Sequence, residues 1–189
     1  MESQRPMRAD ARRNRERILQ TARQAFATEG LGVSLDEIAR RAGVGPGTVH
    51  RHFPAKEALI EEVLTEHLAS LTEQARQAVR TDRDGSAFFP FLHSLISEAR
   101  AKQDLADALS QADVKLSERT QETALHLRQA FGELLVRAQE AGTVRTDVDA
   151  EDVQAVVLGA LTAERQNPTP DRPGRMAAVV LDCLLPEGG

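Results

Sequence analysis

The segment between Leu35 and Phe53 restricts the fold of this chain more than any other. It places a small residue, a glycine and an apolar residue at Ala39, Gly43 and Val49. A helix-turn-helix needs this order, because a small side chain lets two helices cross closely and glycine adopts the left-handed conformation of the turn. The apolar residue then packs beneath the crossing. The pattern predicts two short crossed helices.

Residues around this segment indicate where its helices begin and end. Ser34 followed by Glu37 forms a capping box, in which each side chain satisfies a backbone donor at the start of the second helix. The third helix is expected to begin near Pro46, which a first turn tolerates, and to end before Pro54. A long helix over residues 56–80 follows, with its apolar side chains in one stripe.

Helices are predicted on both sides of this segment. Residues 11–28 repeat apolar side chains at three- and four-residue steps, which is typical of an amphipathic helix. Trp and Tyr are absent and Ala, Leu, Glu, Arg and Gln dominate, so the composition favours an all-α fold. Further helices are predicted over residues 86–101, 103–110, 113–141, 149–165 and 172–185.

Charge is distributed unevenly along the chain. The net charge is −5, yet residues 1–56 contain 11 Lys and Arg against 6 Asp and Glu, whereas residues 57–189 contain 13 against 23. A positively charged N-terminal part (the head, residues 1–56) followed by a negatively charged remainder (the body, residues 57–189) suits a protein that binds phosphates at one end. Residues 1–10 contain two arginines and no hydrophobic period, and we expect them to form a flexible basic arm.

Several classes of protein are disfavoured by what the chain lacks. A single cysteine, Cys183, excludes an intrachain disulfide, and its aliphatic neighbours predict a buried thiol. No apolar run reaches the length of a membrane span, and no signal peptide is evident, so we expect a soluble cytoplasmic protein with no membrane partner. His50 and His52 point away from each other on a helix, so we predict neither a metal site nor a cofactor.

The run LDEIARRAGVGPGTVHRHFPAKEAL, preceded by ILQTARQAFATEG, resembles the DNA-binding domain of the tetracycline-repressor-like (TetR) family over roughly residues 12–60. The resemblance implies a three-helix N-terminal helix-turn-helix domain, joined by a long helix to a larger helical-bundle domain that binds an effector and dimerises. Residues 11–56 and 57–189 are the expected extents of these domains. The resemblance also implies a transcriptional regulator rather than an enzyme. Because members of this family usually repress transcription, the regulator is expected to be a repressor.

The resemblance further implies which residues contact DNA. Ser34 is expected to cap the second helix and touch a phosphate, while His52 and Lys56 contact phosphates beside the groove. The expected recognition face comprises Pro46, Gly47, Thr48, His50 and Arg51. The chemistry agrees, because threonine offers a donor and a methyl group for thymine, and arginine pairs with guanine through two hydrogen bonds.

Two recognition residues depart from the family pattern. Many members carry Tyr at the position of His50 and a polar residue at that of Pro46. Proline has no backbone N–H, so base contacts are expected to shift towards Thr48 and Arg51. Because an imidazole gains a proton at about pH 6.5, we expect operator affinity to weaken as the pH rises from about 6 to about 8.

Beyond about residue 65 the resemblance is architectural only. It implies a cavity among the fourth to eighth helices for a small, mainly apolar effector. The candidate lining is Leu64, His67, Phe88, Phe91, Leu92, Leu95, Leu105, Leu109, Leu125 and Phe131. Helix packing alone also explains most of the aromatic patch around Phe88.

One recognition helix covers too few base pairs to discriminate among genomic sites, which predicts a homodimer on a palindromic double-stranded DNA operator. The last two helices have apolar faces suited to pairing with their mates. The residues expected there are Ala155, Val156, Leu158, Leu161, Val179, Val180 and Leu184. The long helix from Lys56 is then the only covalent lever between effector pocket and DNA-binding head.

Two other classes of function stay open. One is an enzyme with a hydrophobic pocket, although no nucleophile with a companion base, metal-ligand spacing or Gly-rich phosphate loop favours it. The other is a helical adaptor whose basic head binds an acidic protein. Also open is whether Arg8, Arg12 and Arg13 enter a minor groove or only form a solvated tail.

Overall fold

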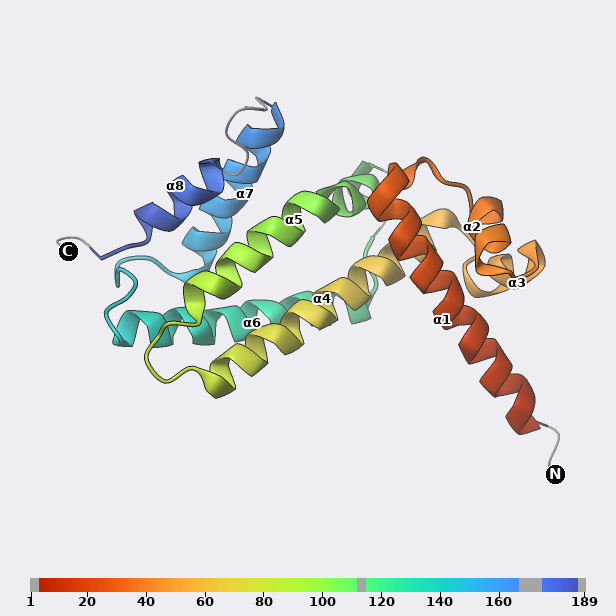
Figure 1. The fold of residues 1–189 in the computed structure, drawn as a ribbon, viewed down its shortest axis with the longest axis horizontal. Coiled ribbons are helices and arrows are strands. Elements are labelled where there is room, and N and C mark those ends of the chain that lie inside the picture. The colour runs from red at the N-terminus through yellow and green to blue at the C-terminus, as the bar shows by residue number, and fades with distance from the viewer. Residues whose placement is uncertain (1–3, 112–114, 167–174, 187–189) are drawn as a thin grey trace. The chain divides into compact units, whose positions relative to one another are not determined.

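The computed structural model describes residues 4–111, 115–166 and 175–186, and every regular element in those ranges is helical, which confirms the all-α fold class. None of the described helices combines the length and hydropathy that crossing a bilayer requires. The elements (Figure 1) are α1 Gln4–Glu29, η1 Gly30–Gly32, α2 Leu35–Ala42, α3 Pro46–His52, α4 Lys56–Thr81, α5 Phe88–Gln111, α6 Glu118–Glu140, α7 Ala150–Gln166 and α8 Arg175–Cys183.

The first helix begins earlier than the hydrophobic pattern indicated. α1 starts at Gln4 instead of near Ala11, so residues 4–10 are helical rather than irregular. Pro6 lies in the first turn, where backbone N–H groups have no acceptor within the helix, so its missing N–H costs no hydrogen bond. A proline at this position therefore does not mark the boundary of the helix.

The chain divides into two compact units, and α4, α5 and α6 each contribute to both. The first unit comprises residues 1–67 and 102–120. Its core lies among α1, α2, α3 and the start of α4, with side chains such as Ile18, Ile38 and Leu59 fully buried. Leu109, near the end of α5, is also buried in this core, so the three N-terminal helices do not complete it alone.

The second unit comprises residues 68–101 and 121–189 and has its own apolar core, drawn from α4, α5, α6, α7 and α8. Phe88, Leu134 and Val153 are among its fully buried side chains. The last three predicted helices correspond to α6, α7 and α8. Asp149 caps α7, because its Oδ1 accepts hydrogen bonds from two backbone N–H groups of the first turn, at 2.8 and 2.9 Å.

Two expectations for the body are wrong. The helices predicted over residues 86–101 and 103–110 are one helix, α5, since neither glycine nor proline lies between them to interrupt it. Cys183 is exposed instead of buried. On α8 the core takes Val180, whereas Cys183 lies one turn from the exposed Val179 on the outward side.

Candidate nucleic-acid interface

The start of α2 is fixed by the predicted cap. Ser34 has an extended backbone, and its Oγ accepts a hydrogen bond from the backbone N–H of Glu37 at 3.2 Å. This bond satisfies one of the donors that a first turn leaves free. The Glu37 carboxylate does not turn back to the cap, because it accepts hydrogen bonds from Arg40 and Arg41 instead. The capping box is thus half formed.

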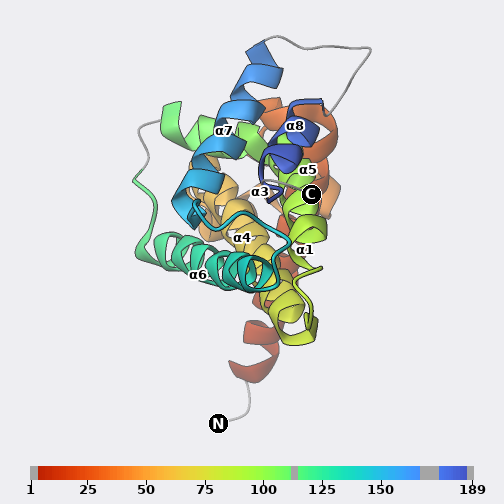
Figure 2. The ribbon, with the colours of Figure 1, turned by 90° about the vertical axis from the view of Figure 1, so that its left-hand side faces the viewer.

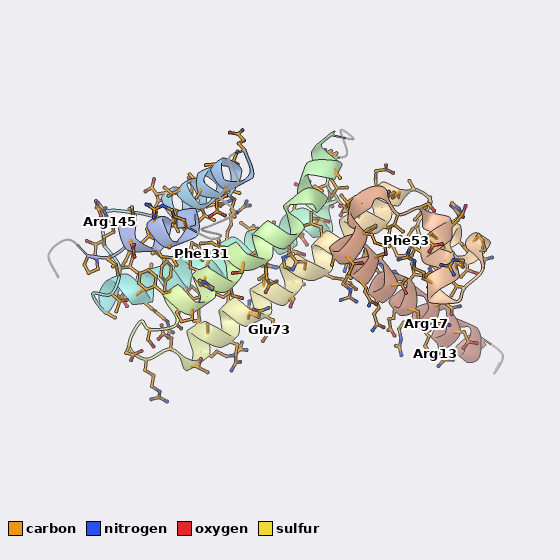
Figure 3. The ribbon with its side chains drawn as sticks, turned by 45° about the horizontal axis from the view of Figure 1, so that its top comes forward. Arg13, Arg17, Phe53, Glu73, Phe131 and Arg145 are labelled. Carbon is orange, nitrogen blue, oxygen red and sulfur yellow. The ribbon has the colours of Figure 1, made fainter. Side chains whose placement is uncertain are left out.

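Gly43 makes the turn between α2 and α3 in the left-handed conformation, with φ 63° and ψ 38°. Its N–H donates to the Arg40 carbonyl at 3.2 Å, and the N–H of Val44 donates to the Ala39 carbonyl at 3.0 Å. A side chain here would also meet Arg17 of α1, whose Nη2 lies 2.7 Å from the position of a Cβ atom. The left-handed backbone therefore favours glycine, while the flexible end of the Arg17 side chain can shift to admit a Cβ atom; Figure 3 labels Arg17 on α1.

The third helix buries one side and exposes the other. Val49 and Phe53 belong to the core of the first unit, and Figure 3 labels Phe53. The other side carries the predicted recognition set, of which Thr48 is half-buried and the rest exposed: Pro46, Gly47, Thr48, His50 and Arg51. The structure therefore brings these five residues together on one short accessible helix. His52, at the end of α3, is half-buried.

Asp36 joins this surface, although the sequence did not single it out. Its Oδ1 lies 3.5 Å from Nε2 of His50, and both side chains are exposed. The attraction between them grows when the imidazole is protonated, but water screens it at this exposure. The pairing depends on the crossing of α2 and α3, so spacing along the chain gives no signal for it.

Lys56 opens α4 and is tied to the segment that follows α1. Its ammonium donates a hydrogen bond to the backbone carbonyl oxygen of Leu31 and is half-buried. An ammonium has three N–H donors, so the contact with Leu31 leaves donors for a phosphate. Lys56 thus anchors the long helix in addition to any contact with DNA.

Ion pairs neutralise other charges of α2. Arg40 Nε donates to Glu37 at 2.8 Å, Arg41 Nε donates to Glu37 at 2.6 Å, and Arg41 Nη2 donates to Glu29 of α1 at 2.9 Å. The hydrogen bonds from Arg40 and Arg41 lower the pKa of Glu37 to about 2. This network joins the end of α1 to α2, and it occupies two arginines that a count of charges alone would assign to phosphate binding.

The predicted effector residues fall into two separate cores. Phe88, Phe91 and Phe131 cluster in the second unit, with the ring centroid of Phe131 5.7 Å from that of Phe88 and 6.4 Å from that of Phe91. Leu92 is buried beside them and Leu95 is partly buried. These five side chains form one apolar group.

The remaining candidates do not join that group. Leu64 and Leu109 pack in the core of the first unit. His67 is half-buried and is the last residue of the first stretch of that unit, residues 1–67. Leu125 is 46% exposed. The side chain of Leu105 lies outside the described residues. Because α4 and α5 each run through both units, side chains from opposite ends of one helix enter different cores.

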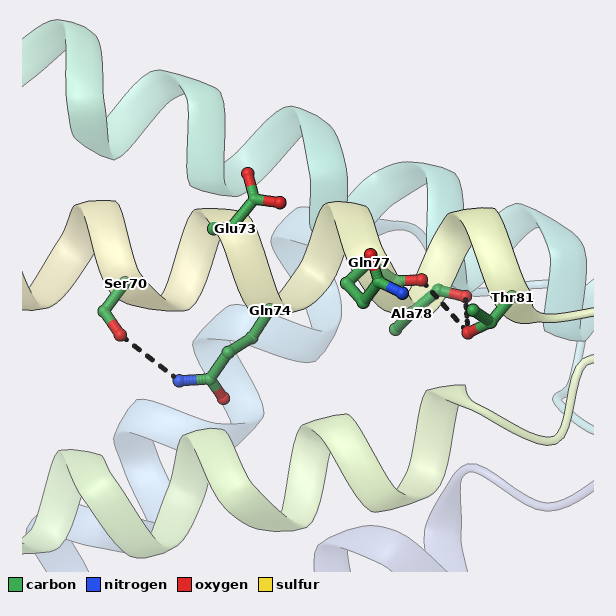
Figure 4. A pocket seen from close by; sticks show the side chains of 6 residues that line it. All are labelled: Ser70, Glu73, Gln74, Gln77, Ala78 and Thr81. Atoms are coloured by element: carbon green, nitrogen blue, oxygen red, sulfur yellow. Dashed lines mark hydrogen bonds between the residues drawn. The ribbon is translucent and has the colours of Figure 1, made fainter.

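A shallow hollow runs along α4 in the second unit (Figure 4), lined by Ser70, Glu73, Gln74, Gln77, Ala78 and Thr81. Its polar side chains bond along the helix, since Gln74 Nε2 donates to Ser70 Oγ at 3.4 Å and Arg80 Nη2 donates to Glu73 Oε1 at 2.7 Å. The hollow is open to solvent and contains no predicted effector residue, unlike the enclosed apolar site expected for a ligand.

The last two helices present apolar side chains on two sides. α7 and α8 pack side by side, as Figures 1 and 2 both show. The expectation that Leu161, Val180 and Leu184 face a partner is wrong, because these three are buried in the core of their own unit. The exposed apolar side chains are Ala155, Val156, Leu158, Val179 and Leu185. Apolar side chains therefore remain exposed on both helices.

Two stretches of the chain match described protein families. Residues 18–63 match the bacterial regulatory proteins of the tetR family. Residues 83–186 match the C-terminal domain of SbtR-like transcriptional regulators. The first stretch contains α2 and α3, and the second contains α5 to α8.

Individual proteins show the same likeness. The chain is 32% identical over 144 residues to the HTH-type transcriptional repressor KstR2 of Rhodococcus jostii (strain RHA1). The matched region covers 72% of this chain and 71% of that protein. It is 39% identical to a TetR transcription regulatory protein from Mycobacterium vanbaalenii, with a TM-score of 0.70 over 95% of this chain and 99% of that one. For a TetR transcriptional regulator from Streptomyces coelicolor the identity is 31% and the TM-score 0.69, over 92% and 99% of the chains.

Proposed function

This chain belongs to the TetR family of transcriptional regulators, and we propose that it represses transcription from a palindromic operator, which it binds as a homodimer and leaves when a small, mainly apolar ligand binds. The accessible outer side of α3 carries the proposal. Val49 and Phe53 anchor this helix in the core, so its outward residues are held in place for a duplex groove.

The roles of the outward residues follow from their chemistry. Arg51 reads guanine through two hydrogen bonds, and Thr48 contacts thymine with its methyl group or a base edge with its hydroxyl. Pro46 and Gly47 allow close approach of the helix to the groove. Ser34, His52 and Lys56 contact the flanking phosphates and set the register without reading sequence, whereas His50 belongs to the recognition face.

Exposed apolar side chains on α7 and α8 support dimerisation. Val156 of α7 is 49% exposed and Val179 of α8 is 38% exposed. Pairing with the same face of a second copy would bury these side chains in a two-fold interface. The two recognition helices would then meet half-sites about one DNA turn apart or slightly more, so the operator would be palindromic.

The aromatic group around Phe131 supports an apolar ligand. We place the effector site at the side chains of Phe88, Phe91, Leu92 and Phe131, because they combine a large apolar surface with few polar groups. Suppose the ligand binds best when the two DNA-binding heads of the dimer are not spaced to match the operator. It must then bind more weakly in the DNA complex, by about 1–3 kcal/mol. Release of the operator is the reciprocal effect.

Selection of bound duplexes from a random pool tests the DNA-binding part of this proposal. We expect a palindromic consensus, and affinity for it should fall steeply as salt rises, because binding releases counterions from phosphates. A scrambled duplex of equal length is the control. Enrichment of no sequence, at any salt concentration, would contradict the proposal and favour an adaptor that binds an acidic protein.

A further inference from the structure

One glutamate in the first unit joins three helices. Glu62 lies on α4 with a side chain only 14% exposed, and its Oε1 is 2.9 Å from Nη2 of Arg15 on α1. Nη1 of Arg119, on the first turn of α6, donates to both carboxylate oxygens at 3.0 Å. One carboxylate thus holds a guanidinium on each side.

Arg15 connects this carboxylate to the recognition helix. Its guanidinium carbon lies 5.5 Å from the ring centroid of Phe53, where a cation is attracted to the face of an aromatic ring. Phe53 ends α3, and its N–H donates to the Val49 carbonyl at 2.8 Å. Because Glu62 fixes Arg15 over this ring, it restrains the residue that closes the recognition helix.

The start of α6 is docked on the same stretch of α4. Oε1 of Glu61 accepts hydrogen bonds from the backbone N–H of Ser117 at 2.6 Å and from the Thr120 hydroxyl at 2.8 Å. The Thr120 hydroxyl is also 2.8 Å from that of Thr65, and both threonines are buried. The first turn of α6 therefore has several polar bonds to α4 besides the ion pair of Arg119.

We propose that Glu62 is a positioning residue for DNA recognition, because it holds α3 in place through Arg15 and Phe53. Arg119 makes this positioning of α3 depend on the start of α6. The inference rests on the proposed DNA-binding function. It ties the recognition helix to the start of α6, which belongs to the same unit although it lies more than 50 residues further along the chain. By linkage, ordering of α3 on DNA and ordering of residues 117–120 reinforce each other.

Amide hydrogen exchange of the free protein tests the positioning role without DNA. We expect Glu62→Gln to speed exchange in residues 47–53 by roughly two- to thirtyfold, as for other positions that couple two sites. Glu66→Gln is the matched control, because Glu66 pairs with Arg23 of α1 at 3.4 Å one turn further along α4 and has no contact with Arg15 or Phe53 among the described residues. Equal exchange of residues 47–53 in the two variants would overturn the proposal.

Two further variants separate the halves of the connection. Arg119→Gln should speed exchange in residues 47–53 less than Glu62→Gln does, because Arg15 keeps its partner. Arg15→Lys keeps a cation for Glu62 but loses the flat guanidinium over Phe53, so it should speed exchange in residues 47–53 more than in residues 117–120. If residues 47–53 exchange in Arg119→Gln as fast as in the wild type, the start of α6 does not contribute to the positioning of α3.

A DNA titration then checks the consequence for recognition. With the duplex selected from the random pool, Glu62→Gln should lower the ratio of specific to scrambled affinity by roughly two- to thirtyfold, while Glu66→Gln keeps the wild-type ratio. A wild-type ratio in Glu62→Gln would refute the role in recognition. If the wild type itself prefers no sequence, the proposed function fails, and the exchange measurements still decide whether Glu62 positions α3.

Discussion

At the scale of single residues, α3 divides its side chains between anchoring and contact. Val49 is buried, while Arg51, two residues later, is exposed. The separation matters for mutagenesis, because an exposed residue without a structural partner can be removed without loss of the fold. Substitutions on the outward side should therefore change DNA binding and leave the free energy of unfolding nearly constant.

Arg51→Ala tests direct base contact. We expect it to weaken binding to the selected operator by about 1–3 kcal/mol and to relax the preference at one base position in each half-site. Lys56→Ala, by contrast, should weaken binding to all sequences alike. Fluorescence anisotropy on matched and scrambled duplexes measures both effects, and equal losses on the two duplexes for Arg51→Ala would contradict its role.

His50 predicts a dependence on pH. A protonated imidazole attracts phosphate, so operator affinity should fall as the pH rises from about 6 to about 8. Titrations at fixed ionic strength measure this, with His50→Gln as the control in which the fall should be smaller. Operator affinity of the wild type that does not change with pH would contradict this role of His50.

At the scale of elements, the turn between α2 and α3 and the contacts of α4 hold the helix-turn-helix in shape. The turn depends on a single left-handed residue, Gly43. The contacts of α4 depend on adjacent carboxylates, Glu61 and Glu62, that reach α1 and α6. Both features should respond to small chemical changes.

Gly43→Ala should destabilise the fold by about 1–2 kcal/mol, because the left-handed conformation is costly for a residue with a Cβ atom. The new methyl group would also displace Arg17. Gly47→Ala is the matched control, since nothing lies within 4 Å of its Cβ position and its φ is not positive. Urea denaturation measures both variants, and equal stability would mean that the turn can relax.

Acid should weaken the contacts of α4. Burial disfavours the ionised form of Glu62, but hydrogen bonds from Arg15 and Arg119 outweigh it and lower its pKa. A carboxylate with a lowered pKa stabilises the fold above the pKa of the unfolded chain, about 4.3, and that contribution is lost as the pH falls towards the folded value. Thermal melts from about pH 6 to about pH 3 should therefore decline less in Glu62→Gln than in the wild type. Parallel curves would show that Glu62 contributes nothing to this decline.

At the scale of the whole molecule, dimerisation is tested by charge on the outward face of α7. Val156 is 49% exposed there, and Val136 on α6 is 50% exposed and serves as the matched control. Val156→Glu should weaken the dimer by roughly 3 kcal/mol or more, because an uncompensated carboxylate would be buried in the interface. Val136→Glu should leave it intact. Sedimentation equilibrium distinguishes them, and an unaltered dimer in Val156→Glu would move the interface elsewhere.

The division into two units also changes how the chain is partitioned. The sequence predicted a boundary at residue 56, between a DNA-binding domain and a body. In the structure, residues 57–67 and 102–120 group with the N-terminal helices. We therefore propose that the DNA-binding head includes the end of α5 and the start of α6, with Leu109 completing its core.

Local features of this protein were determined by the sequence itself. The cap at Ser34, the left-handed turn at Gly43 and the inward side of α3 at Val49 depend on residues only a few positions apart, so their patterns predicted them correctly. The all-helical class followed from composition and from periodicity. The resemblance of residues 12–60 to a known family then gave the recognition set.

Only the tertiary structure decided which distant residues meet. Asp36 pairs with His50, and Glu61 bonds to the start of a helix that begins 57 residues later, because helices cross at angles that no spacing in the sequence encodes. The same holds for α7 and α8, where apolar residues line two sides of each helix and packing selects the side that enters the core. Local conformation depends on neighbours in the chain, whereas partners across a core depend on how whole helices pack.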